Sequence, residues 1–381
     1  MRITFEKVFK KIAAKYLCKK YGFKEVRATF FANFIYDDWI RQDPKTDLTL
    51  KQKMWLYKNG FVFSRYYQYG LTEDNIHEYL SDFDFWRIMP LTNSFNRWID
   101  DKLTMRYTLA PFKEHLPEYY MSIDKKGVKS VLMDSPENIA FDDDYLINLG
   151  KEKKIIAMKP NAGTEGKGFI KYTYENEKFY FNDVELTPDE IRDFYKNVKD
   201  YIVTEYIVQC REHAELCDQS PCTLRVISMK DGEKDPVIIY AYARFGTSSS
   251  GAVSNMCAGG VGIGYDSYTG DYYDKFLYRV GNDVRFYDEH PETKISLKGK
   301  KLPNYELVRD KVIQMHKYMS SLEYLGFDII VTDNGFKICE INSAPNLADN
   351  QTLSYPVYTN KEVAEFFDKR LKGKRRNEKK N

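Results

Sequence analysis

The sequence lacks the features that mark several large classes of protein. No run of about 18 apolar residues occurs in its 381 residues, which argues against a transmembrane helix. The charged N-terminus is not followed by the apolar core of a signal peptide, so we expect a cytoplasmic protein. Six cysteines in a chain this long do not form a disulfide framework, and Cys210, Cys217 and Cys222 lack the paired spacing of a zinc site.

The sequence also has no large excess of charge of one sign. It contains 58 Lys and Arg against 56 Asp and Glu, a net charge of +2, which argues against a dedicated nucleic-acid binder. The exception is the segment 361–381, where basic residues crowd together from Lys369 onward. We interpret it as a basic C-terminal tail. It is either simply solvated or makes weak peripheral contact with an anionic membrane surface or an anionic polymer.

What the sequence does contain is enough apolar material for a folded core. Hydrophobic residues make up 43% and charged residues 30%, and the length suits two or three packed lobes. Residues 1–95 show mostly helical periodicity, whereas short strands and helices mix from about residue 118 onward without strict alternation. This pattern predicts an α+β fold with a helical N-terminal region, a first lobe over 96–205 and a second over 206–360.

A glycine-rich loop follows a predicted strand that ends in Lys159. Backbone N–H groups can approach phosphate oxygens closely where glycines remove the side chains, and a lysine supplies a point charge. The loop lacks the GK[ST] ending and the following helix of a Walker A motif. An ordinary glycine-rich hairpin loop is the alternative. The candidate phosphate-binding residues are Lys159, Gly163, Thr164, Gly166 and Gly168.

The last predicted hairpin carries three oxygen ligands of the kind that Mg²⁺ prefers. Glu340 and Asn342 lie two residues apart on one strand and therefore share a face. Asp328 on the partner strand lies opposite Glu340 only if the connecting loop has the correct length. An ordinary hairpin with polar residues facing solvent is the alternative.

The length of that loop decides whether the three ligands converge. A three-residue loop, Asp333 to Gly335, would pair Thr332 with Phe336 and place the three ligands on one face. A two-residue Asn-Gly turn would instead pair Asp333 with Phe336 and break the site. The site therefore predicts an odd-length loop with Gly335 in the left-handed conformation.

Two arginines and a second glycine-rich stretch complete the polar motifs. Arg225 and Arg244 lie on neighbouring predicted strands, and their planar forks suit phosphate or carboxylate, although a half-exposed sheet often carries such arginines. Asn255 precedes four glycines between Gly259 and Gly264, which suggests that the backbone approaches a ligand closely.

The order of these motifs resembles the ATP-grasp superfamily over residues 95–350. The resemblance rests on Lys159 with its glycine loop, the strand at 202–208, and Asp328 followed by Glu340-Ile341-Asn342. Residues 244–246, Asn255, 259–260 and 269–270 are similar to the sugar-transfer-associated group within that superfamily.

The resemblance implies an ATP-dependent fold in which two lobes clamp the nucleotide. ATP and Mg²⁺ would be the cofactors, and an Asp, a Glu and an Asn would hold the metal: Asp328, Glu340 and Asn342. The phosphates would meet Lys159 and Lys102, although Asp101-Lys102 is equally well an exposed helix pair. The adenine would meet Glu205, Tyr206 and Ile207, and the ribose would meet Glu212 or Glu215. The catalytic residues would be Arg225, Arg244 and Asn255.

The chemistry implied is ligation of a carboxylate to an amine through an acyl-phosphate. The finer resemblance points to a carboxylate of a surface polysaccharide or its precursor, joined to an amino acid or amine. The alternatives are an amino-acid or peptide ligase without a sugar, and a non-catalytic nucleotide-binding partner of polysaccharide assembly.

Overall fold

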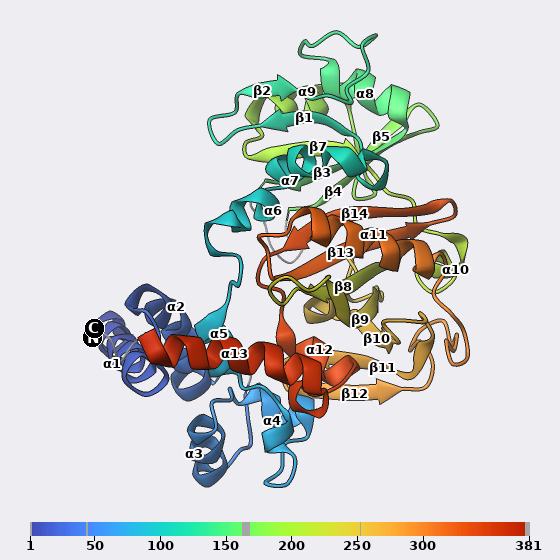
Figure 1. Ribbon diagram of the computed structural model, residues 1–381. Coiled ribbons are helices and arrows are strands. Elements are labelled where there is room, and N and C mark those ends of the chain that lie inside the picture. The colour runs from blue at the N-terminus through green and yellow to red at the C-terminus, as the bar shows by residue number, and fades with distance from the viewer. Residues whose placement is uncertain (1, 43–44, 162–167, 252, 378–381) are drawn as a thin grey trace.

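The computed structural model describes residues 2–42, 45–161, 168–251 and 253–377, and Figure 1 shows their arrangement. A helical N-terminal region lies beside two separate β-sheets, each of which carries its own helices. The predicted α+β composition is therefore confirmed. Within the described ranges, no helix is both long and apolar enough to cross a membrane.

The N-terminal region is helical because its apolar residues recur at helical spacing and bury one face of each helix. They form a single cluster that includes Leu17, Ala28, Leu56 and Phe83, all fully buried. The segment 73–80 forms only a short 3-10 turn, Ile76–Glu78. The main helices of this region are α1 (Arg2–Tyr21), α2 (Glu25–Tyr36), α3 (Leu50–Lys58), α4 (Ser64–Tyr69) and α5 (Asp82–Ile88).

The first sheet has seven strands in the order β2-β1-β7-β3-β4-β5-β6, and all pairs are antiparallel. Helices α8 (Tyr145–Lys153) and α9 (Pro188–Asn197) bury their apolar faces in one core with these strands. A capping box formed by Thr187 and Glu190 starts α9. The strands are β1 (Tyr119–Ile123), β2 (Lys129–Val131), β3 (Ile155–Pro160), β4 (Ile170–Glu175), β5 (Lys178–Phe181), β6 (Val184–Leu186) and β7 (Tyr201–Glu205).

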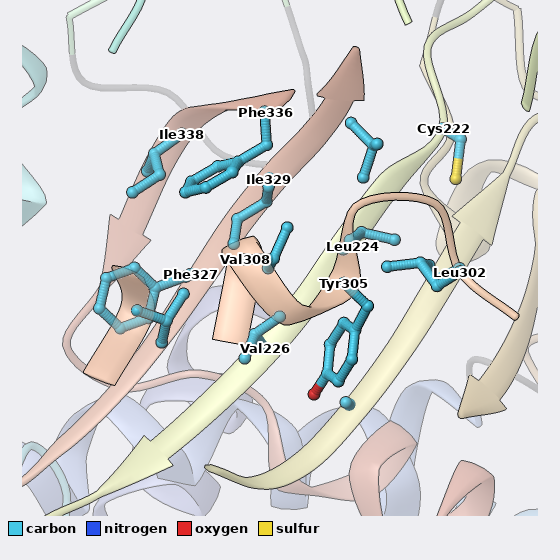
Figure 2. Close-up of a cluster of buried hydrophobic side chains, with 14 of the residues drawn as sticks. Cys222, Leu224, Val226, Leu302, Tyr305, Val308, Phe327, Ile329, Phe336 and Ile338 are labelled. Carbon is cyan, nitrogen blue, oxygen red and sulfur yellow. The ribbon is translucent and has the colours of Figure 1, made fainter. Parts of the chain in front are cut away.

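The second sheet also has seven antiparallel strands, in the order β12-β11-β10-β9-β8-β13-β14. Helix α11 (Tyr305–Tyr318) packs on one face, where Tyr305 and Val308 meet Leu224 and Phe327 in the core cluster (Figure 2). This helix ends at Tyr318, and the chain enters β13 at Tyr324. The strands are β8 (Thr223–Met229), β9 (Val237–Phe245), β10 (Val261–Tyr265), β11 (Tyr272–Val280), β12 (Asp283–Tyr287), β13 (Tyr324–Thr332) and β14 (Gly335–Asn342).

The segment predicted as a basic tail begins as part of the fold. Helix α13 (Lys361–Asn377) buries Val363, Phe366 and Phe367 against the second sheet and α5. Its basic residue Arg370 pairs with Glu323 at 2.8 Å and with Asp231 at 3.2 Å. The expectation of a solvated tail is therefore wrong for the apolar face of α13, which is buried in the fold. The apolar residues of this segment recur at helical spacing, and their burial holds the helix on the fold despite its basic residues.

The N-terminal region is fastened to the second sheet through helix α12 (Leu347–Leu353). Gln68 of α4 donates hydrogen bonds to Asp349 (3.0 Å) and Thr352 (3.1 Å). Gln351 accepts one from the Leu80 N–H at 3.0 Å, and Ala348 joins the N-terminal core cluster. Gln68, Asp349 and Gln351 are buried, so the contact is part of the folded core rather than a loose interface.

The glycines of β10 make room for the chain itself and not for a ligand, which corrects the expectation from the sequence. A Cβ on Gly264 would lie 1.9 Å from the Leu353 carbonyl oxygen. A Cβ on Gly262 would lie 2.7 Å from Met256 Sδ. Strand β10 can therefore lie close to α12 and to the 3-10 turn Met256–Ala258 only because Gly262 and Gly264 lack side chains.

We expect Gly264→Ala to destabilise the protein by about 3 kcal/mol, because the new methyl group must displace the backbone of α12. Urea denaturation measures the change. Gly299→Ala is the matched control: its φ is +72° and nothing lies within 4 Å of the added carbon, so only backbone strain of about 1 kcal/mol is expected. Equal losses in the two variants would contradict the close approach.

Two buried histidines should make stability depend on pH. Burial lowers the pKa of His213 and of His316 to about 4, from 6.5. On acidification the histidines of the unfolded chain take up protons at a higher pH than those of the folded protein. Each buried histidine therefore lowers the free energy of unfolding as the pH falls from 6.5 to 4, by up to about 3 kcal/mol.

We expect His316→Gln to flatten this pH dependence, measured as the unfolding free energy at pH 7 and pH 5. The side chain lies between Ser228 and the Leu322 carbonyl oxygen, which its Nε2 contacts at 2.8 Å. The exposed His77→Gln is the control and should keep the slope of the unchanged protein. An unchanged slope in His316→Gln would contradict the prediction.

Candidate nucleotide and metal site

A cavity of about 410 Å³ lies between the two sheets and collects most of the residues selected from the sequence. The link α6 (Arg97–Asp100) and α7 (Lys102–Thr108) joins the N-terminal region to the first sheet and packs on β14. Residues from both sheets and from this link therefore face one space. The predicted residues that line it are Lys102, Lys159, Glu205, Tyr206, Ile207, Arg225, Arg244, Asn255, Asp328, Glu340 and Asn342.

Six predicted residues are not among those lining the cavity. Gly163, Thr164 and Gly166 lie outside the described residues. Gly168, at φ +76°, has a carbonyl oxygen that accepts a hydrogen bond from the Tyr201 hydroxyl. Glu212 on α10 (Arg211–Ala214) and Glu215, which directly follows this helix, are both exposed and do not line the cavity.

The hairpin of β13 and β14 brings the three oxygen ligands together by a route that the sequence did not predict. Thr332 pairs with Gly335, so the loop has two residues and not three. Regular pairing from that turn would set Asp328 opposite Cys339. A β-bulge shifts the register there, and Asp328 pairs with Glu340.

The bulge therefore has the effect that was expected of an odd-length loop, because it sets Asp328 opposite Glu340. Because one extra residue is inserted in β14, Glu340 and Asn342 face the cavity instead of the core. Cys339 lines the cavity beside them, while Ile338 and Ile341 stay fully buried in the core. The expected convergence is present, and the expected loop is wrong. Gly335 has a positive φ, of 146°.

Asp328 is held between two arginines on neighbouring strands. Arg225 on β8 lies directly opposite it in the sheet and donates two hydrogen bonds, one of them 3.0 Å from Nη2 to Oδ2. Arg244 on β9 approaches within 3.1 Å. Burial alone would raise the pKa of Asp328, but the two guanidinium groups outweigh it and hold that pKa below its usual range.

The two lysines approach the same point from the first sheet and the link. Lys102 Nζ lies 3.7 Å from Glu340 Oε2. Burial lowers the pKa of Lys159, and the like charge of Lys102 lowers it further. Burial raises the pKa of Glu340, Lys102 opposes that change, and Asp328 adds to it. The arrangement places two ammonium and two guanidinium groups around two carboxylates in one cavity.

The other end of the cavity is apolar. Strand β7 ends at Glu205, and the chain next joins the second sheet where the Cys210 N–H donates to the Val331 carbonyl oxygen at 2.8 Å. The connecting residues Tyr206 and Ile207 therefore lie outside both ladders. Ala157, Phe169 and Ile330 line the cavity with them. This surface can cover a flat apolar ring while the connecting backbone presents polar groups.

Sequence reasoning missed several residues of the cavity wall. Asp349 is buried and pairs with Arg279 at 3.0 Å. Asn346 donates to Asp349 at 3.2 Å. The only signal was their position a few residues beyond Asn342, in the Asn-Leu-Ala-Asp-Asn stretch that starts α12. Tyr242 and Cys339 also line the cavity, but nothing in their local sequence marks them.

The hairpin residues fit a hard cation with few protein ligands. Among the described residues, no group of three or more His, Cys, Asp or Glu side chains could hold a metal ion. Magnesium, however, is usually bound by one or two carboxylates together with phosphate oxygens and waters. Asp328, Glu340 and Asn342 supply such a set. Asn342 would bind a cation through Oδ1, whereas its Nδ2, a hydrogen-bond donor, is buried without a partner and is suited to an anionic oxygen.

Comparison with known proteins identifies the class. The model of the sugar-transfer associated ATP-grasp family matches residues 91–361, and the chain belongs to that family. The fold is accordingly an ATP-grasp fold preceded by a helical region. Members of the superfamily are ATP-dependent ligases that generally use ATP with divalent metal ions. No curated protein sequence matches the chain.

Solved structures resemble the chain at low sequence identity. D-alanyl-alanine synthetase A from Vibrio cholerae is 13% identical, with a TM-score of 0.42, over 73% of this chain and 65% of that one. A D-alanine–D-alanine ligase from Bacillus anthracis is 14% identical, with a TM-score of 0.37, over 93% and 95%. An L-amino acid ligase from Bacillus licheniformis is 6% identical, with a TM-score of 0.37, over 77% and 50%. The chain thus spans less than two thirds of the Vibrio and B. licheniformis proteins.

We expect Asn342→Leu and Asp328→Asn to have opposite effects on the unliganded protein. Asn342→Leu removes a buried amide nitrogen that has no partner, so stability should stay the same or rise. Asp328→Asn leaves two partly buried arginines without their carboxylate and should cost about 3 kcal/mol or more. Denaturant titration without nucleotide measures both. A large loss for Asn342→Leu would contradict the view that this residue is kept for a ligand.

Proposed function

We propose that the protein is an ATP- and Mg²⁺-dependent ligase that joins a carboxylate to an amine through an acyl-phosphate. The observation that carries the proposal is the convergence of Lys102, Lys159, Arg225 and Arg244 with Asp328, Glu340 and Asn342 on one cavity between the two lobes. Membership in the family supplies ATP as the co-substrate.

The two ends of the cavity assign an orientation to the nucleotide. The adenine lies against Ile207 and Ala157, with the backbone of Glu205 to Ile207 contacting its polar edge. The phosphates extend toward Lys159 and Lys102, whose charges offset those of the phosphate oxygens. Glu212 is exposed on α10 and is a poor candidate for the ribose.

The reaction has two steps. A carboxylate oxygen of the acceptor attacks the γ-phosphorus of ATP, and the bond to the β-phosphate oxygen breaks to release ADP. A neutral amine then attacks the carbonyl carbon of the acyl-phosphate, inorganic phosphate leaves, and the amine gives up a proton. Arg225 and Arg244 stabilise the negative charge that gathers on the transferred group, and Asn255 lies beside them on the cavity wall.

Asp328, Glu340 and Asn342 would hold the metal ion, which supplies charge neutralisation at the phosphates. Arg225 and Arg244 already satisfy Asp328 in the unliganded protein. These arginines therefore keep the buried carboxylate ionised and ready to act as a ligand. They also stay near the reacting phosphate, where their charge is needed.

The acceptor we propose is a carboxylate of a surface polysaccharide or its precursor, and the donor is an amino acid or amine. The support is the family itself, which is described as sugar-transfer associated. The second candidate is an amino-acid or peptide ligase that uses no sugar. Its support is weaker, because it rests on the general chemistry of the superfamily.

The test is Mg-ATP turnover measured as phosphate release, with panels of uronic acids and amino acids as carboxylates and of amino acids and simple amines as nucleophiles. Hydroxylamine in place of the amine should trap the acyl-phosphate as a hydroxamate. We expect release that requires a carboxylate. Tight ATP binding without release for any pair would favour a non-catalytic partner, and no ATP binding would overturn the proposal.

We expect Glu340→Gln and Lys159→Met to lower kcat/KM by at least about a hundredfold, because the first removes a carboxylate that would hold the metal ion and the second removes a positive charge beside the phosphates. Hydroxamate formation is the readout. Glu212→Gln is the matched control for Glu340→Gln: it makes the same chemical change at an exposed site outside the cavity and should leave the rate unchanged. Equal rates for all three variants would place the chemistry elsewhere.

A further inference from the structure

Helix α1 exposes a stripe of large apolar side chains. Phe5, Val8 and Ile12 are 54%, 52% and 62% exposed, and their spacing of three and four residues places them on one face. Large apolar side chains grouped on an outer face mark a surface that contacts something apolar. In Figure 1, α1 lies at the end of the N-terminal region farthest from the two sheets.

Basic residues run beside this apolar stripe. The helix contains seven basic residues and one acidic residue, and that acid, Glu6, is paired with Lys10. Lys11, Lys15 and Lys19 are exposed and follow one another at intervals of four, so they form a neighbouring stripe. In the part of the chain that the structure describes, none of these three lysines forms an ion pair with a carboxylate.

The charge selects α1 over other exposed surfaces. Helix α2 also exposes apolar residues, at Val26, Phe30 and Phe34, but it carries one acidic and one basic residue. The basic helix α13 uses Lys369 and Arg370 in ion pairs with Asp231 and Glu323. The surface of α1, defined here as Phe5, Val8, Ile12, Lys11, Lys15 and Lys19, combines exposed apolar groups with uncompensated positive charge.

We propose that α1 docks the protein onto an anionic membrane surface. A helix with a basic stripe beside bulky apolar side chains lies in the plane of a lipid headgroup layer, with the apolar groups inserted and the lysines among the anionic headgroups. A second copy of the chain is a poor occupant, because two such faces would repel each other. An anionic polymer would satisfy the lysines and leave the apolar stripe exposed.

The experiment is co-sedimentation of the full chain with vesicles of phosphatidylcholine alone or mixed with phosphatidylglycerol. We expect binding only to the mixed vesicles, weakened by salt because the lysine contribution is screened. The triple variant Lys11→Glu, Lys15→Glu, Lys19→Glu should reduce the binding constant at least tenfold. The triple variant Phe5→Ser, Val8→Ser, Ile12→Ser should reduce it comparably.

The matched control is Lys125→Glu, Lys126→Glu, Lys196→Glu, which makes the same change of charge at exposed positions on the first lobe and should bind as the unchanged protein does. Equal loss in this control, or no binding to anionic vesicles, overturns the proposal. Loss with the lysine variant but not the apolar variant overturns insertion of the apolar stripe and leaves a purely electrostatic contact, of the kind that an anionic polymer would also make. A dimer in sedimentation velocity that the apolar variant dissociates, without vesicle binding, overturns it in favour of self-association.

Discussion

The structure depends on how opposing charges are buried together on the four strands at the β14 end of the second sheet. Arg244, Arg225, Asp328 and Glu340 lie on four neighbouring strands, and Asp328 pairs directly with Arg225 on one side and Glu340 on the other. A carboxylate so little exposed would be costly without partners. The guanidinium groups remove that cost, and the same groups face the cavity. The same residues therefore stabilise the sheet and form the charged part of the cavity.

The remaining charges of the cavity come from outside this sheet. Lys159 ends a strand of the first sheet, and Lys102 begins a helix in the link between the parts. Both are drawn toward Glu340, whose charge is otherwise opposed by burial and by Asp328. Lys102 is paired with Glu340, but burial and the like charge of Lys102 still lower the pKa of Lys159, so added negative charge would stabilise its ammonium form. Polyphosphate would supply such negative charge, so the electrostatics of the cavity favour the ligand that the family implies.

The helical N-terminal region is tied to this site and is not a detached appendage. Asp349 lines the cavity, and its carboxylate oxygens accept hydrogen bonds from Arg279 of β11 and Gln68 of α4. A side chain of the N-terminal region thus helps to fix part of the cavity wall. The outer face of the same region, on α1, is basic and apolar. The region therefore carries two sets of apolar residues. One set is buried in its core, and the other is exposed on α1.

The sequence by itself determined the α+β composition, the helical N-terminal region and the identity of most charged residues of the cavity. It could do so because helical periodicity, a capping box at Thr187 and ligand pairs such as Glu340 and Asn342 are properties of residues close together in the chain. It did not reveal strands β10 to β12 or the apolar contacts that make α13 part of the core. Those depend on partners far away in the sequence.

Only the tertiary structure decided how the site is assembled. The hairpin turn has two residues, and a bulge at Cys339 restores the pairing of Asp328 with Glu340, which no rule of local sequence requires. The glycines of β10 accommodate α12 and not a ligand, a distinction that depends on the position of Leu353. Asp349 reaches the cavity because Arg279 and Gln68 hold it there. Local sequence fixes which groups are available, whereas their register, burial and partners are set by packing between segments that the chain separates by tens to hundreds of residues.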